Sequence, residues 1–135
     1  MITLSKTSYS IVMPVLILLA LDLSNACTLN NGHEDVVTVT TAGSPNNEHV
    51  ATVYNVSGGG AAGYVYNCVN LRKREEPFES KTGIVFTASG TRRITAVWQD
   101  DEHLIIRHSK SAGIYKNAEE WGSDRKIRIS YAEEE

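Results

Sequence analysis

The clearest pattern in this chain is a series of short segments that are rich in β-branched and aromatic residues. In the last of them, Ile127, Ile129 and Tyr131 alternate with basic and hydroxyl residues, which is typical of a strand with one buried and one solvated face. We expect strands at residues 36–41, 50–56, 64–71, 83–88, 94–98, 104–108 and 126–131.

Turn-forming residues separate these segments and keep the connections short. Clusters of Gly, Pro, Asn and Asp lie at residues 43–47, 57–60, 89–90 and 100–101. Residues 114–121 contain Ala and Glu and precede Gly122, so they predict the one helical turn. The predicted fold class is therefore mainly β, with a small antiparallel meander sheet of about six to seven strands and one short helical turn.

The N-terminal pattern differs from the rest of the chain. Lys6 precedes an apolar stretch at residues 11–20, which has the length of a signal-peptide core and is too short to span a bilayer. Ser24 and Ala26 are small residues at the −3 and −1 positions of a cut before Cys27. We expect a signal peptide at residues 1–26 and export of the mature protein. A retained, uncleaved anchor is the alternative.

Cleavage divides the rest of the chain into three further parts. It leaves 135 − 26 = 109 residues, enough for one core, and we expect a linker at 27–34, a single β domain at 35–131 and an acidic tail at 132–135. The tail is expected to be solvated and disordered. Lys6 and Asp22 leave together, so the formal net charge stays at −3, which argues against a nucleic-acid partner.

Both cysteines, Cys27 and Cys68, remain in the mature part, and the fate of Cys27 is open. Residues 23–27 resemble the lipobox of bacterial lipoproteins, in which the cysteine after the cut carries the lipid, although Ser24 stands where an aliphatic residue is usual. In an oxidising compartment Cys27 could instead form a disulfide with Cys68. A free thiol is the third alternative. One sulfur cannot hold both a lipid and a disulfide.

A weak internal repeat aligns residues 44–53 with residues 98–107. Both segments contain a polar turn, then Glu-His, then an apolar strand, so His49 and His103 are expected at equivalent strand starts. The unit resembles the turn and strand of β-propeller blades, but seven strands are too few to close a propeller.

The same region resembles a family of small, functionally uncharacterised bacterial envelope proteins, whose pattern includes an S-P-D-G turn, a C-G-A-T-T segment and a tryptophan before a D-D turn. The matching positions are Ser44-Pro45, residues 50–54, Gly60-Ala61, residues 69–71, Trp98, Asp100-Asp101 and residues 104–106. The family cysteine falls on Gly59, nine residues before Cys68. The resemblance implies a location and a fold, and no activity.

Other chemical signals favour structural roles. The glycines of residues 58–63 match G-x-G-x-x-G, but a strand pattern follows where a dinucleotide site needs a helix, so we expect a hairpin loop. His103 and His108 should face opposite sides of a strand and cannot share a metal. Asp100 and Asp101 are expected in a solvated turn. Trp98 should anchor the sheet, whereas Trp121 could be an exposed contact.

These observations predict no catalytic, cofactor or metal site. The expected function is that of an exported, non-enzymatic protein of the bacterial envelope, in the periplasm or anchored to the membrane. Its partner would be an unidentified protein, with membrane contact only through the signal peptide or a lipid on Cys27. The alternatives are a secreted inhibitor or immunity-type binder of a toxin or hydrolase, and a hydrolase whose site the sequence does not reveal.

Overall fold

The structure is a computed structural model that describes residues 33–90 and 93–135. The predicted signal peptide and Cys27 lie outside these residues, so their predicted roles stay predictions. In the part described, no helix is long and apolar enough to cross a membrane.

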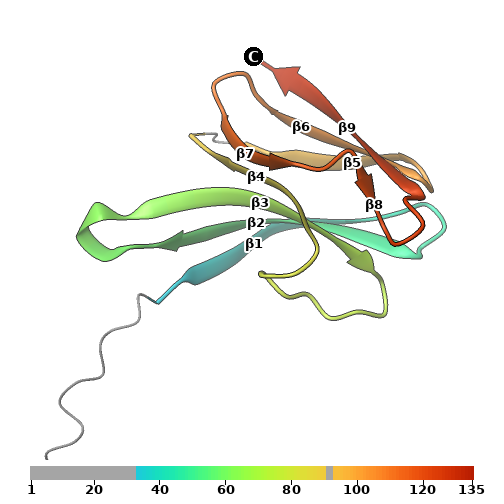
Figure 1. Cartoon of the computed structure of the whole chain (residues 1–135), viewed down its shortest axis with the longest axis horizontal. Helices are drawn as coiled ribbons and strands as arrows, with labels where there is room; N and C mark the ends of the chain where they lie inside the picture. Colours follow the sequence, from blue (N-terminus) through green and yellow to red (C-terminus); the bar gives the residue numbers. More distant parts are fainter. Residues whose placement is uncertain (1–32, 91–92) are drawn as a thin grey trace, which may run out of the picture. The chain divides into compact units, whose positions relative to one another are not determined.

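Strands make up most of the described chain and are joined by turns and by one longer loop at residues 74–83 (Figure 1). The strands are β1 (Asp35–Gly43), β2 (His49–Gly58), β3 (Tyr64–Lys73), β4 (Ile84–Ser89), β5 (Thr95–Asp100), β6 (His103–Ser109), β7 (Gly113–Asn117), β8 (Glu120–Trp121) and β9 (Ile127–Glu134). A single 3-10 turn, η1 (Gly60–Ala62), joins β2 to β3 within this part of the chain.

The strands form two sheets, which confirms the mainly β class. The described residues form a five-stranded and a four-stranded sheet, where one meander of about six to seven strands was expected. The first sheet has the order β1-β2-β3-β4-β7, and the second has the order β5-β6-β9-β8. All pairs are antiparallel except β6 and β9, which run parallel. The parallel pair arises because β7 and β8 lie between β6 and β9 in the chain and cross from one sheet to the other.

The two sheets enclose one apolar core. Its large side chains come from both sheets and include Val53, Val69, Leu71, Val85, Phe86, Leu104, Ile106, Ile127 and Ile129. On β3, Val69 and Leu71 are two residues apart and therefore point to the same face, toward the second sheet. Phe86 stacks on His108 with ring centroids 5.5 Å apart, which joins β4 to β6 across the core.

A loop at residues 74–83 covers part of the opposite face of the first sheet. Tyr54 on β2 is completely buried, packs against Phe78 of the loop with ring centroids 5.1 Å apart, and donates a hydrogen bond to the Ser80 carbonyl. Gly83 ends the loop at φ 62°, where a Cβ would lie 2.6 Å from the Leu71 carbonyl oxygen. Residues 50–54 of β2 are consequently buried on both faces, so no alternation of buried and exposed residues marks this strand.

The predicted helical turn at residues 114–121 is wrong, because the segment forms β7 and β8. Its backbone is bonded to both sheets: the Ala118 N–H donates to the Val85 carbonyl, and the Glu119 carbonyl accepts from the Ile129 N–H. Pairing with two sheets satisfies backbone groups that a helix would satisfy internally, and it overrides the weak helical preference of Ala and Glu.

The acidic C-terminus is also not a disordered tail, since β9 continues through Glu134. Glu133 and Glu134 pair with His108 and Ser109 of β6. Basic side chains lie opposite the acids: Arg107 is 3.5 Å from Glu134. This exposed ion pair is worth little by itself, but it relieves the repulsion between neighbouring carboxylates at the strand end.

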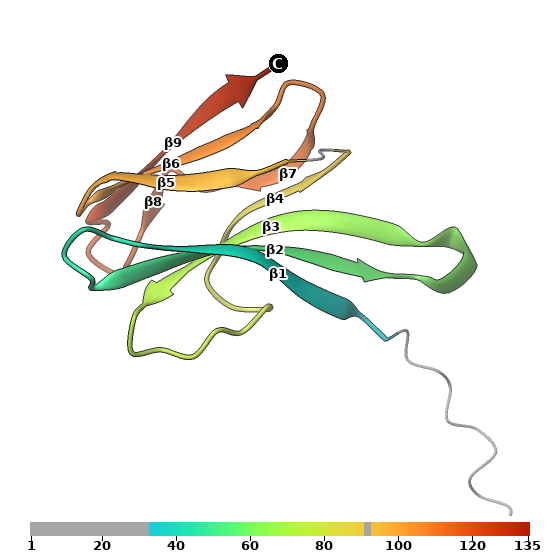
Figure 2. The ribbon, with the colours of Figure 1, turned by 180° about the vertical axis from the view of Figure 1, so that it is seen from behind.

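The hairpin of β2 and β3 extends beyond the second sheet, as both views show (Figures 1 and 2). Val65, near the tip, is 55% exposed, although Val69 on the same strand and the same face is completely buried. The glycine-rich residues 58–63 form the end of this hairpin, as the sequence predicted, and no helix follows them.

Candidate functional site

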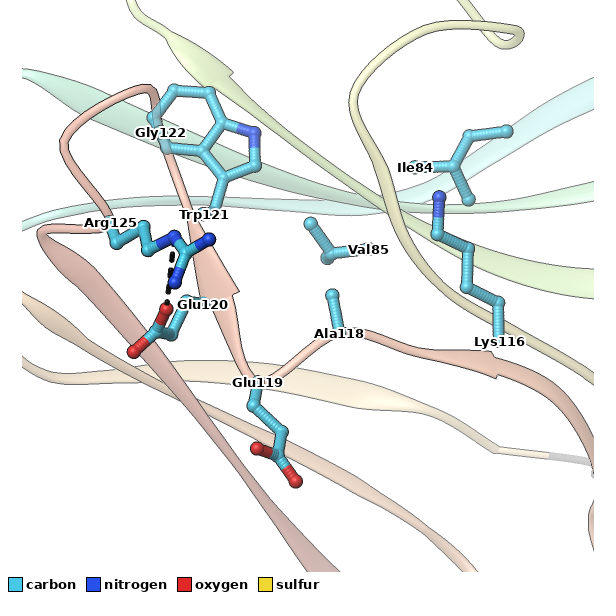
Figure 3. Close-up of a pocket in the computed structure, with 9 residues that line it drawn as sticks. All are labelled: Ile84, Val85, Lys116, Ala118, Glu119, Glu120, Trp121, Gly122 and Arg125. Atoms are coloured by element: carbon cyan, nitrogen blue, oxygen red, sulfur yellow. Dashed lines mark ion pairs between the residues drawn. The ribbon is translucent and has the colours of Figure 1, made fainter.

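A groove forms where the chain passes from the first sheet to the second. It has a volume of about 630 Å³ and is lined by Ile84, Val85, Lys116, Ala118, Glu119, Glu120, Trp121, Gly122 and Arg125. Val85 and Ala118 lie between Trp121 on one side and Lys116 on the other (Figure 3). We call this surface the Trp121 groove.

Trp121 is held in place by packing and strand pairing. It pairs with Ile127 of β9 and packs against the core while staying partly exposed. The ring of His49 meets the indole nearly at right angles, at 83° and 5.5 Å between centroids. His49 also contacts Trp98 at 6.3 Å, so the first residue of β2 separates the two tryptophans.

The turn after Trp121 shapes the far wall of the groove. Gly122 has φ 100°, and a Cβ there would lie 2.9 Å from Asp124 Oδ1, so the position requires glycine. The turn brings Arg125 back beside Glu120, with Nε and Oε2 3.8 Å apart (Figure 3). The arginine side chain is 81% exposed and the glutamate 49%. This pair therefore stays in water and is free to exchange partners.

Two further hollows adjoin the groove and share Trp121 with it. One, of about 450 Å³, includes His49, Lys73, Asp124 and Lys126. The other, of about 290 Å³, lies toward the loop at residues 74–83 and includes Pro77. Trp121 lines all three hollows and is therefore the aromatic centre of an extended surface that contains both charged and apolar residues.

The chemistry of this surface suits binding better than proton transfer. A carboxyl group that serves as a general acid or base is usually buried or placed beside another carboxyl group. Glu119 and Glu120 are instead exposed, and Glu120 faces a cation. Within residues 33–90 and 93–135, no three His, Cys, Asp or Glu side chains are placed to share a metal ion.

The predicted site residue Cys68 does not line the groove. Cys68 has no disulfide partner among the described residues. It is 4% exposed and lies on the face of β3 turned away from the core, with Sγ 3.8 Å from Thr87 Oγ1. Burial raises the pKa of the thiol, and hydrogen bonds with Thr87 and Tyr54 offset part of the rise. Its predicted disulfide partner, Cys27, is outside the described residues.

Tyrosines form a second surface, near the tip of the projecting hairpin. Tyr66 contacts Tyr64 at 5.2 Å and Tyr115 at 5.4 Å between ring centroids. Tyr115 is 66% exposed. The Tyr64 hydroxyl donates to Glu34 Oε1, and this bond raises the pKa of the phenol. We call these three tyrosines the tyrosine surface. The sequence marked Tyr64 and Tyr66 as strand residues and placed Tyr115 in the expected helical turn. The contact of Tyr115 with Tyr66 depends on the pairing of β7 with β4.

The other residues considered in the sequence begin strands, form turns or join the two sheets. His49 and His103 begin β2 and β6, which confirms the equivalence predicted from the repeat. The two repeat turns also touch, since the Asn46 N–H donates to Asp101 Oδ1 at 2.7 Å. Asp100 Oδ1 accepts from the Glu102 N–H, as expected of a turn. Trp98 anchors the strand edge as predicted: its Nε1 donates to the Ala42 carbonyl at 3.0 Å.

No protein-family model, curated protein or solved structure matches this chain. The resemblance to envelope proteins therefore stays a prediction.

An exposed contact was one alternative expected for Trp121, and the groove around it was not predicted. The groove joins side chains of β4, β7, β8 and the following turn, and residues 114–121 were expected to be helical. The one available signal was a large aromatic side chain among charged residues near a turn glycine.

Proposed function

We propose that this chain is an exported, non-enzymatic protein of the cell envelope that acts by binding another protein at the Trp121 groove. The observation that supports this proposal is the partly exposed indole of Trp121, which lines three adjoining hollows. Tryptophan and arginine dominate the binding energy of protein interfaces because they combine large apolar area with a polar group.

The distribution of charge around the groove supports a protein partner. Lys116, Glu119, Glu120 and Arg125 surround the apolar floor of Val85 and Ala118. An apolar centre within a polar, hydrated rim is the usual anatomy of a protein interface. The mixed signs give no single strong field of the kind that attracts a polyanion.

Site-specific photo-crosslinking in cells tests the groove. A benzophenone amino acid replaces Lys116 in the full chain, and the matched control replaces Arg107, an exposed basic residue on the solvent face of β6. We expect one discrete protein adduct from position 116 and none from position 107. Equal labelling at both positions, or no adduct at 116, would overturn the proposal.

A charge exchange at the groove separates binding from folding. Arg125→Glu places like charges beside Glu120 and should remove the adduct, while the double variant with Glu120→Arg restores the pair and the adduct. Both side chains are largely exposed, so neither change should alter the unfolding midpoint by much.

The export part of the proposal rests on the N-terminal sequence and is tested by the intact mass of the protein from its native host. A mature N-terminus at Cys27 with added diacylglyceryl and acyl mass establishes a lipoprotein. An unmodified Cys27 and a loss of two hydrogens establish the disulfide with Cys68. An intact Met1 contradicts export.

One observation favours the alternative of a secreted inhibitor. The β2–β3 hairpin projects beyond the core (Figure 2). The tyrosine surface lies near the tip of this hairpin. A projecting loop beside exposed aromatic rings is a shape that can enter the cleft of an enzyme. In that case the benzophenone at position 115, and not at 116, should capture a hydrolase whose activity falls on titration with the purified protein.

A further inference from the structure

His49 lies where the two sheets meet, in contact with both tryptophans of the chain. Its ring centroid is 5.5 Å from that of Trp121 and 6.3 Å from that of Trp98. His49 is the first residue of β2 in the first sheet, whereas the tryptophans belong to β5 and β8 of the second. A change in the position of this imidazole therefore changes the packing of the indole that lines the Trp121 groove.

The backbone of His49 is held independently of its ring. The His49 N–H donates to Ser44 Oγ at 3.0 Å, and the His49 carbonyl accepts from the Ser44 N–H at 2.9 Å. On the other side, His49 pairs with Lys73 of β3. The start of the strand is thus fixed, and the imidazole can move by rotation of the side chain alone.

One ring nitrogen of His49 is enclosed. Nδ1 is buried and has no hydrogen-bond partner within residues 33–90 and 93–135. A neutral imidazole carries a proton on one nitrogen only, whereas a protonated imidazole carries N–H groups on both. A buried N–H of a charged ring without an acceptor costs more free energy than contact between a cation and a partly exposed indole returns. The enclosed position suits the neutral ring, and a protonated ring gains acceptors by turning out of it.

Charged side chains surround the open side of the imidazole. His49 lines two hollows, of about 560 and 450 Å³. Their acidic residues are Glu48, Glu75, Glu76 and Asp124, and their basic residues are Lys73, Arg74 and Lys126. The charged residues of β5 and β8, which are Asp100 and Glu120, line neither hollow. A protonated ring that turns outward thus meets water and carboxylate acceptors, in a field of nearly balanced sign.

We infer that His49 is a pH-dependent wedge for Trp121: the neutral ring packs between the two indoles, and the protonated ring turns outward into the adjoining hollows. Histidine is the side chain that ordinarily changes charge between about pH 5 and about pH 8, so the movement occurs in that range. Without the wedge, Trp121 loses the ring contact on its His49 side and becomes more accessible to solvent.

The consequence for binding rests on the proposed function of the Trp121 groove. A partner binds most tightly to an indole that is already fixed, because a mobile side chain must be ordered when the complex forms. Binding at the groove is therefore strongest with the neutral His49 ring, and it weakens as the pH falls and the ring becomes charged.

Tryptophan fluorescence of the full chain tests the wedge without a partner. The chain has two tryptophans and both contact His49, so all of the tryptophan emission comes from indoles beside this ring. We expect quenching by acrylamide to increase along a sigmoidal curve as the pH is lowered from about 8 to about 5. Quenching that stays constant or decreases over this range contradicts the inference.

Substitutions assign the titration to one histidine. His49→Phe keeps an aromatic ring that cannot be protonated, and His49→Gln removes the ring, so quenching of neither variant should depend on pH. His103→Gln is the matched control and should keep the full pH dependence. His103 begins β6 at the equivalent place in the repeat, but it bonds to Ser130 on the face opposite to Leu104 and the core. A pH dependence that survives both changes at His49, or that is lost in the control, overturns the inference.

Photo-crosslinking from position 116 separates this inference from the proposed function. With cells suspended at about pH 8 and about pH 5, the adduct should be several-fold weaker at the lower pH, and His49→Phe should remove the difference. Equal adduct at both pH values in the chain that keeps His49 contradicts the pH dependence of binding. No adduct at either pH overturns the proposed function alone, and the quenching measurement still decides whether His49 is the wedge.

Discussion

The two halves of the first sheet have similar residues and very different surroundings. Val69 and Val65 lie on the same strand and face, yet Val69 is completely buried and Val65 is 55% exposed. The two valines differ because the second sheet packs over the half of the first sheet that contains Val69. The β2–β3 hairpin extends beyond the second sheet into solvent (Figure 1).

The opposite face of the same sheet repeats this contrast with tyrosines. Tyr54 lies under the loop at residues 74–83, whereas Tyr66 and Tyr115 lie beyond it and form part of the tyrosine surface. A strand-forming residue type thus indicates a strand and not a buried position. The covered half holds completely buried side chains such as Val69 and Tyr54, and the uncovered half leaves side chains such as Val65 and Tyr115 exposed.

The largest expected effect is the loss of a core ring from the covered half. Phe86 is completely buried and stacks on His108, so Phe86→Ala should lower the free energy of unfolding by about 3–5 kcal/mol in urea denaturation followed by tryptophan fluorescence. Tyr115→Ala, at an exposed ring of the uncovered half, should cost less than about 1 kcal/mol. Equal losses would contradict the contrast between the halves.

The sharpest comparison uses one residue type on one strand. Val69→Ala removes two methyl groups from a closed core and should cost about 2–3 kcal/mol, from lost burial and the cavity that remains. Val65→Ala should change the free energy of unfolding by at most about 0.5 kcal/mol. If Val65→Ala is as costly, the hairpin tip is covered in solution.

Removing one tyrosine hydroxyl under the loop at residues 74–83 and one outside it tests whether the loop shields the sheet from water. Tyr54→Phe removes the hydrogen bond to the Ser80 carbonyl under the loop and should cost about 1 kcal/mol. Tyr64→Phe removes an exposed bond to Glu34, which water replaces, so its effect on the unfolding midpoint should be much smaller. The reverse order would mean that the loop does not shield Tyr54.

The smallest expected effect is a dependence on alkaline pH. Burial raises the pKa of the Cys68 thiol above its ordinary value of 9.0, so the folded state keeps a proton that the unfolded state loses. This contribution is complete below pH 9.0 and is lost as the pH rises through the raised pKa. Urea titrations from about pH 8 to about pH 11 should show a smaller slope for Cys68→Ala than for the unsubstituted chain, and an unchanged slope would contradict it.

Much of the fold could be predicted because most strands carry their own local signal. The strand expected at residues 50–56 is β2, His49–Gly58, and the one expected at 126–131 is the first part of β9. The turn before each histidine of the repeat was recognised from its Asn, Asp and Pro content. Residues 114–121 were mispredicted because their strand pairing depends on Val85 and Ile129, which are distant in sequence.

Most of the candidate site could not be predicted from the sequence, because it also depends on residues that are distant along the chain. Trp121 stands out in the sequence, but the groove also needs Ile84 and Val85 from another strand and the turn that returns Arg125 to Glu120. Such hollows depend on side chains from several elements, and no local pattern records them.

The sequence by itself determined the β class, most strand positions and the polar turns, because these depend on neighbouring residues and backbone preference. Only the tertiary structure decided that there are two sheets, that β9 adds parallel to β6, and which half of the first sheet is covered. Burial depends on what another part of the chain places over a residue. That is why valines four positions apart on one face of β3 have opposite environments.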